Sequence, residues 1–211
     1  MLALAAVATV FGAPLPTAVQ AAPAALSPEN QALVAKASTY LQGLNQAEGR
    51  FVQTDARGGI SQGAFYLSRP GKIRFQYEAP SGLLVVADGH MVNVWDPRLK
   101  SFNAYPLGFT PLHVFLAKEV RLDQGAQIDQ VERTADGFSI TARDKRRPRD
   151  GAITLSFSNS PLRLKEWTVI DGKGQRTKVD LLALKEASGL NPKLFQLNNP
   201  LRPPARPRAG L

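Results

Sequence analysis

The stretch Lys72-Ile73-Arg74-Phe75-Gln76-Tyr77 decides the fold class, because polar and apolar residues alternate along it without a break. Successive side chains of a β-strand point to opposite faces of a sheet, so this alternation predicts a strand with one buried face. That face carries the three apolar side chains Ile73, Phe75 and Tyr77. The sequence therefore predicts a sheet with an apolar interior on one side.

The same two-residue period continues on both sides of this stretch and predicts about eleven strands. Turn signals such as Asp88-Gly89 and Asp96-Pro97 separate neighbouring strands. The predicted strands begin at residue 50 and continue at 64–68, 72–77, 83–87, 92–95, 101–105, 127–133, 138–142, 152–157, 162–170 and 176–184. Strands joined by short turns predict an antiparallel meander, in which each strand pairs with the next.

Two segments follow the helical period instead. A helix of about 18 residues is predicted from Ser27-Pro28 to near Gly49, because Ser is a favoured N-cap and Pro a favoured first helical residue. Its apolar stripe consists of Leu33, Ala37, Leu41 and Leu44. A second, short helix opens at Thr110-Pro111 and includes Leu112 and Phe115. Helices on the concave face of a curved sheet enclose an apolar cavity, so we expect a mainly β (α+β) fold with a site for a lipid or other hydrophobic ligand.

The composition excludes several kinds of site. The 211 residues contain no cysteine, which removes disulfides, a thiolate nucleophile and a lipid-modified N-terminal cysteine. The two histidines have no partner histidine at metal-ligand spacing, so neither a metal nor a cofactor is expected. A net charge of +9 and a pI near 10.1 are compatible with binding to nucleic acid. Interleaved aromatic residues and a recognition module are missing, so we expect no nucleic-acid partner.

The N-terminus has the pattern of a secretion signal. Residues 1–21 carry no charge, Leu2 to Phe11 is apolar, and Val19-Gln20-Ala21 fits a signal peptidase site. We expect export with cleavage near Ala21, and the alternative is a disordered Ala/Pro-rich N-terminus. Residues 22–200 would then form the folded domain, followed by a Pro/Arg-rich tail at 201–211.

One short motif raises the question of catalysis. Gly59-Ile60-Ser61-Gln62-Gly63 matches the G-x-S-x-G pattern of a hydrolase nucleophile elbow. That elbow needs a helix directly after the serine, whereas Ser61 leads into a predicted strand. A hairpin turn is the better interpretation, and we expect no enzymatic activity. An esterase acting through Ser61 is the rival hypothesis, which a Ser61→Ala variant would test.

A charged run from Arg143 to Asp150 lies between two predicted strands. It holds five positive and two negative side chains. A solvated hairpin loop is one interpretation. The other is a docking surface for an acidic protein or an anionic membrane. The basic residues that would form it are Arg143, Lys145, Arg146, Arg147 and Arg149.

Arg69 follows an apolar strand face, since counting by twos places Phe65, Leu67 and Arg69 on the same side. A buried, unpaired charge costs several kcal/mol. Arg69 must therefore either extend to water at the rim of the sheet or find acceptors, such as helix-end carbonyls, on whatever covers that face.

Four sequence elements occur together in a specific order and spacing. They are Phe51-Val52-Gln53-Thr54, the stretch from Gly63 to Tyr77 containing Arg69-Pro70-Gly71-Lys72, the stretch from Leu84 to Gly89, and Val94-Trp95-Asp96-Pro97. In this combination the chain resembles the LolA family, the periplasmic carriers of outer-membrane lipoproteins. The likeness is strongest over residues 50–115.

The resemblance implies an open, incompletely closed antiparallel β-barrel with a helical lid over an apolar cavity, which agrees with the strand count. Arg69 matches the family's arginine that locks the lid by hydrogen bonds. With the periodicity, the resemblance predicts an acyl-binding wall and lid formed by Phe65, Leu67, Ile73, Phe75, Tyr77, Val85, Leu33, Leu41, Leu44, Leu112 and Phe115.

The resemblance also implies partners. The chain would accept acylated lipoproteins from an inner-membrane ABC transporter of the LolCDE type. It would pass them to an outer-membrane receptor of the LolB type or to the membrane itself, acting as a periplasmic monomer. The alternative is a periplasmic module of the same fold that binds or senses another lipid or hydrophobic ligand.

Overall fold

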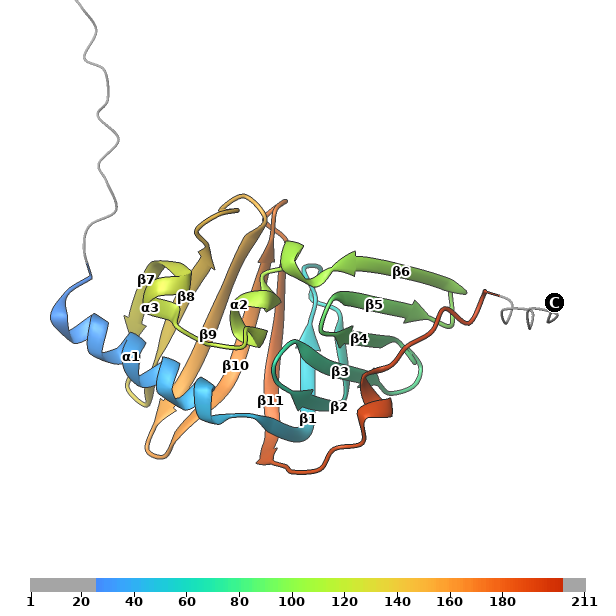
Figure 1. The fold of residues 1–211 in the computed structure, drawn as a ribbon, viewed down its shortest axis with the longest axis horizontal. Helices are drawn as coiled ribbons and strands as arrows, with labels where there is room; N and C mark the ends of the chain where they lie inside the picture. The colour runs from blue at the N-terminus through green and yellow to red at the C-terminus, as the bar shows by residue number, and fades with distance from the viewer. Residues whose placement is uncertain (1–25, 203–211) are drawn as a thin grey trace, which may run out of the picture.

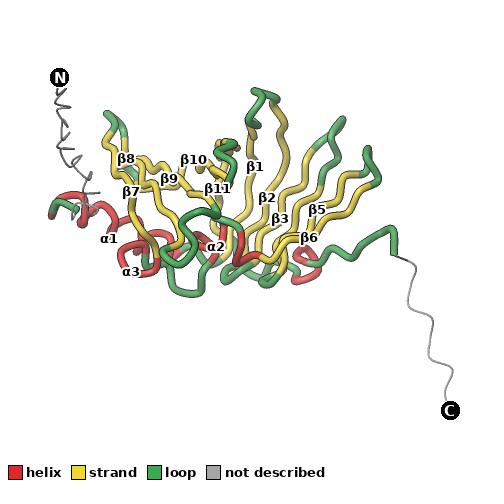
Figure 2. Tube along the Cα trace, turned by 90° about the horizontal axis from the view of Figure 1, so that it is seen from above, coloured by secondary structure: helices red, strands yellow, loops and turns green. Residues whose placement is uncertain are grey.

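A computed structural model describes residues 26–202, which fold around one curved antiparallel sheet of eleven strands (Figures 1 and 2). The expected strand count and open sheet are confirmed. The strands are β1 (Gln46–Thr54), β2 (Ile60–Ser68), β3 (Lys72–Tyr77), β4 (Leu84–Asp88), β5 (Met91–Asp96), β6 (Ser101–Pro106), β7 (Ala126–Arg133), β8 (Gly137–Asp144), β9 (Gly151–Asn159), β10 (Leu162–Asp171) and β11 (Arg176–Glu186).

The strand order corrects the expected meander. The sheet runs β6-β5-β4-β3-β2-β1-β11-β10-β9-β8-β7, so β1 pairs with the last strand and β6 does not pair with β7. Eight registered pairs join β1 to β11. The connection between β6 and β7 is too long for a hairpin, because it carries three short helices. The sheet therefore stays open between these two edges, and this connection spans the gap (Figure 1).

The helices lie together on one side of the sheet (Figure 2). They are α1 (Pro28–Gly43), the 3-10 turn η1 (Leu107–Phe109), α2 (Leu112–Leu116) and α3 (Leu122–Gly125). The hydroxyl of Ser27 accepts a hydrogen bond from the backbone of Asn30 (3.3 Å), as expected for an N-cap. The helix ends at Gly43, not near Gly49, because the chain turns at Leu44 and Asn45 and enters β1.

The main core lies between the concave face of the sheet and these helices. The Phe51 ring meets the rings of Phe75 and Tyr77 edge-on, at centroid distances of 5.2 and 5.0 Å. Such pairs add about 0.5–1.5 kcal/mol each beyond the area they bury. The apolar alternation that predicted β3 thus reflects one face turned toward this core.

A smaller contact lies on the convex face. The C-terminal segment crosses β3 and β4 there and contacts them through its 3-10 turn η2 (Pro192–Phe195). Phe195 and Val86 are 3% and 0% exposed. Arg74 donates a hydrogen bond to the Leu194 carbonyl (3.0 Å). Both faces of β3 and β4 are therefore covered in part.

Within residues 26–202, no helix is long and apolar enough to cross a membrane. The predicted signal peptide at residues 1–21 and most of the predicted tail lie outside the described residues.

Candidate functional site

The predicted wall residues lie side by side on β2 and β3. Phe65 is registered opposite Phe75, and Leu67 opposite Ile73. All four side chains are at most 6% exposed, and Tyr77 is 8% exposed. Val85 of β4, opposite Phe75 in the next strand pair, is half-buried against the same cluster. The alternation in the sequence thus places one continuous apolar surface on the concave side.

The helices add their own apolar side chains to this surface. The Phe115 ring of α2 stacks on the indole of Trp167 in β10 at a centroid distance of 5.9 Å. Trp167 in turn meets Phe75 edge-on at 5.8 Å. The other predicted lid residues belong to this cluster or pack against it: Leu33, Leu41, Leu44 and Leu112. The lid side chains therefore touch the wall directly.

Trp167 is a central residue that the sequence did not reveal. A bulge in β10, between Leu164 and Glu166, shifts the register by one residue. Counting by twos from Leu164 assigns Glu166 to the core, whereas the bulge turns Trp167 inward to 2% exposure. The size and apolar character of the indole were the only available signals.

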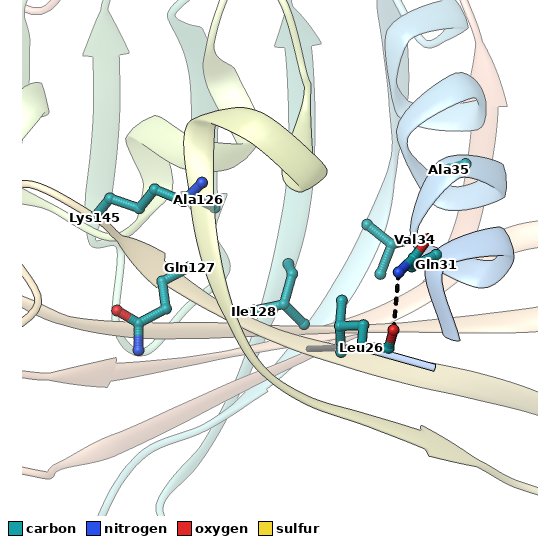
Figure 3. Close-up of a pocket in the computed structure, with 8 residues that line it drawn as sticks. All are labelled: Leu26, Gln31, Val34, Ala35, Ala126, Gln127, Ile128 and Lys145. Atoms are coloured by element: carbon teal, nitrogen blue, oxygen red, sulfur yellow. Dashed lines mark hydrogen bonds between the residues drawn. The ribbon is translucent and has the colours of Figure 1, made fainter. Parts of the chain in front are cut away.

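The apolar cavity expected beneath the lid is filled by side chains in this structure. Leu41, Phe115 and Trp167 are between 0 and 2% exposed, and side chains of the wall and lid occupy the space between them. Two hollows border α1 instead. One, of about 520 Å³, lies between α1 and β7, with Leu26 and Val34 on the helix side (Figure 3).

Lys145 and Gln127 lie at the end of this hollow away from α1 (Figure 3). The second hollow, of about 550 Å³, lies between α1 and residues 119–121. Both hollows follow the seams where α1 meets its neighbours.

Arg69 joins two helices of the lid to the sheet. It follows β2, and its guanidinium donates hydrogen bonds to the carbonyls of Leu41 in α1 and Ala117 after α2, the latter at 2.8 Å. Both acceptors lie at helix C-terminal ends, where carbonyls lack partners within the helix and the dipole favours a cation. Burial lowers the pKa of Arg69, but an arginine stays charged at neutral pH.

Further bonds hold the lid helices to one another. The Gln42 side chain accepts from the backbone of Val120 (2.8 Å) and donates to the carbonyl of Lys118 (3.4 Å). Ser38 accepts from the backbone of Leu122 (3.3 Å). α1 and the segment after α2 are thus tied together, so Arg69 holds a connected lid and not a single helix.

One polar pair lies within the wall. The Tyr77 hydroxyl donates a hydrogen bond to the side-chain oxygen of Gln53 (2.5 Å). Burial raises the pKa of Tyr77, so the phenol stays protonated and the pair neutral. The wall is accordingly uncharged here, as an apolar ligand requires.

The basic run divides into two groups of residues. Arg143 lies in β8 and pairs with Asp129 (2.6 Å), and Lys145 donates to the carbonyl of Gln124 (3.0 Å). Arg147 is half-buried with its guanidinium 4.4 Å from the ring centre of Phe109. Arg146 and Arg149 are exposed. Part of the run is therefore structural, and part remains available at the surface.

The residues considered for catalysis and metal binding do not converge. Ser61 lies inside β2, paired with Gln53 of β1 and followed by strand, so it does not sit on a nucleophile elbow. His90 is exposed in the turn after β4, and His113 lies in α2. Among the side chains of residues 26–122 and 124–202, no cluster of three metal-binding groups occurs.

The sequence matches the model of the family described as "Outer membrane lipoprotein carrier protein LolA" over residues 42–198. This range includes β1 to β11, the lid segment after β6 and the η2 turn. The chain belongs to the LolA family. The family is described as a carrier of outer-membrane lipoproteins.

Two curated relatives and one solved structure are also similar to this chain. An outer-membrane lipoprotein carrier protein of Xanthomonas campestris is 31% identical over 159 residues, which cover 70% of this chain and 75% of the relative. Another from Pseudomonas syringae is 27% identical, covering 79% and 84%. A LolA superfamily structure from Nitrosomonas europaea has 10% identity and a TM-score of 0.47, covering 80% of this chain and 97% of its own.

Proposed function

We propose that the protein carries lipoproteins by binding their acyl chains against the concave wall of the sheet. LolA family membership and the carrier names of its relatives support this function. Removing an acyl chain from water gains about 0.8 kcal/mol per CH₂, so a carrier needs a continuous apolar surface. The wall around Phe65, Phe75 and Trp167 has this character.

The stacking of Phe115 on Trp167 is the observation that carries the proposal. The lid already covers the wall with apolar groups, as an acyl chain would. Cargo entering the site must displace these lid contacts, and their loss offsets part of the gain from acyl burial. Binding is then strong enough for transport and weak enough for release.

We assign Arg69 the role of holding the empty state closed. Its two hydrogen bonds exist only while α1 and the end of α2 lie against the sheet. Lid opening breaks both bonds at once and uncovers the wall. The two hollows beside α1 give acyl chains a place to enter before the lid has fully moved.

The route of the cargo follows from the family and not from this geometry. We propose export through the signal at residues 1–21 and cleavage near Ala21. In the periplasm, cargo would arrive from an ABC transporter of the LolCDE type and leave to a receptor of the LolB type or to the outer membrane itself.

Binding of a triacylated lipopeptide tests the function directly. The purified protein should bind this lipopeptide and not the same peptide without acyl chains. A Phe75→Asp variant should lose binding, whereas Leu182→Ser should not, since Leu182 is exposed on β11 away from the lid. Equal binding of both peptides would refute the proposal.

The alternative ligand is tested on protein purified from its own cells. Organic extraction and mass spectrometry would identify the bound lipid. A phospholipid or glycolipid in place of an acylated peptide, together with no affinity for the lipopeptide, would favour a module for another hydrophobic ligand.

A further inference from the structure

Beside the lid, an exposed aromatic ring contacts a loop that carries three arginines. Phe109, at the end of η1, is 61% exposed although it is large and apolar. The Arg147 guanidinium from the β8–β9 loop lies 4.4 Å from the centre of this ring. We call Phe109, Arg146, Arg147 and Arg149 the basic rim. The contact of Arg147 with Phe109 holds the two parts of this surface together.

The charges of the basic rim are only partly neutralised. Arg147 forms ion pairs with Asp144 (3.4 Å) and Asp150 (3.7 Å). Both acidic side chains of the charged run therefore already have a basic partner. Arg146 and Arg149 are exposed, and their side chains form no ion pair with residues 26–122 or 124–202. Two arginines of the loop that contacts the exposed ring therefore face solvent.

The basic rim adjoins the moving part of the proposed carrier. η1 directly follows edge strand β6 and begins the segment that spans the open side of the sheet (Figure 1). His113 of α2 lies 3.3 Å from Asp144 at the base of the same loop. The next residues of α2 include Phe115, which covers Trp167. A partner bound to the rim would thus lie next to the lid.

We propose that the basic rim docks the protein on an anionic phospholipid surface. Arg146 and Arg149 would lie against lipid phosphates, while the Phe109 ring enters the interfacial layer. Basic residues next to an exposed aromatic ring suit this boundary, which is charged outside and apolar just beneath. An acidic protein would satisfy the arginines but would need its own apolar pocket for Phe109.

The docking proposal extends the proposed carrier function, and the biological purpose of docking rests on that function. Docking would place the lid at the membrane from which cargo leaves or into which it passes. The docking itself requires no cargo. Binding of the empty protein to lipid can therefore fail while acyl binding succeeds, and the reverse.

Vesicle co-sedimentation of the full chain tests the docking. The protein should bind vesicles of phosphatidylcholine with phosphatidylglycerol, and not vesicles of phosphatidylcholine alone. Each basic residue near an anionic surface strengthens binding about fivefold, so Arg146→Gln/Arg149→Gln should bind about 25-fold more weakly. Phe109→Ser should weaken binding about fivefold, because the apolar contribution is lost.

A second surface offers matched controls. Arg163 and Lys185 are exposed and line one hollow with Leu182. This hollow lies on β10 and β11, at the strand ends away from the β8–β9 loop of the basic rim. Arg163→Gln/Lys185→Gln changes the net charge by the same amount, and Leu182→Ser removes a comparable exposed apolar group. Circular dichroism checks that each variant folds. Both control variants should keep vesicle binding within twofold of the wild type.

Three outcomes would overturn the proposal. The wild type does not sediment with anionic vesicles, or the control variants lose as much binding as the rim variants. In the third outcome, the rim variants keep vesicle binding but fail to take up lipopeptide from native membranes containing a transporter, which would identify the rim as a site for an acidic protein.

Discussion

Replacing Arg69 with leucine tests how the lid is held. The change removes hydrogen bonds to Leu41 and Ala117 and leaves an apolar side chain near the lid. A hydrogen bond from a charged donor contributes about 1.5–3 kcal/mol, and relief of arginine desolvation offsets part of two such bonds. We expect the closed state to lose about 2 kcal/mol, which raises the ratio of open to closed molecules about 30-fold.

Less free energy is then spent on opening, so Arg69→Leu should bind a fluorescent triacylated peptide up to about 30-fold more tightly. Its transfer to acceptor liposomes should slow by a similar factor. Binding is measured by fluorescence anisotropy and transfer by loss of anisotropy after liposomes are added. Loading should remain intact.

The matched control is Arg74→Leu. Arg74 also donates to a backbone carbonyl, that of Leu194, but on the convex face and not to the lid. This variant should lose stability without a change in affinity or transfer. Unchanged affinity and unchanged transfer in Arg69→Leu, or equal effects of both substitutions, would refute the role assigned to Arg69.

Three further substitutions give distinct readouts. Phe115→Ala should cost about 3 kcal/mol in urea unfolding and also tighten lipopeptide binding, because cargo then displaces fewer lid contacts; weaker binding would contradict this. Phe195→Ala should cost about 3 kcal/mol but leave lipopeptide affinity unchanged, since Phe195 packs on the convex face. Burial acts to raise the pKa of Asp144. Hydrogen bonds from Arg146 and Arg147, together with the nearby His113, act more strongly in the opposite direction and hold this pKa below its ordinary value. A depressed carboxyl pKa stabilises the fold above the unfolded-state pKa, and this contribution disappears as pH falls through the folded-state pKa. Asp144→Asn should therefore be about 1 kcal/mol less stable at pH 7, and its difference from the wild type should shrink below about pH 4, as followed by urea unfolding across pH. A constant difference at all pH values would contradict that cause.

Local patterns predicted most of the sheet because burial on one face imposes a two-residue period. The alternation from Lys72 to Tyr77 corresponds closely to the concave and convex sides of β3. Pairing between β1 and β11 could not be predicted this way, since the strands are far apart in sequence and no turn joins them. Because β1 pairs with β11, strands β6 and β7 are left as the two edges of the sheet.

Residues of the candidate site could be predicted from the sequence where their chemistry permitted few environments. Arg69, at the end of an apolar face, had to reach water or find acceptors, and only the fold could show that carbonyls of α1 and of the end of α2 supply them. Trp167 was missed because the β10 bulge breaks the alternation. The contact between Arg147 and Phe109 joins segments 38 positions apart, so the charged run alone could not indicate it.

The most direct test of the central claim uses the two tryptophans of the chain, Trp95 and Trp167. A Trp95→Phe variant leaves Trp167 as its only indole, next to Phe115 and Phe75 on the wall. Bromine quenches indole fluorescence only on close approach, so a lipopeptide with brominated acyl chains reports where those chains lie. We predict saturable quenching of Trp167 that parallels binding. Binding of the brominated lipopeptide with no quenching would show that acyl chains do not reach the wall.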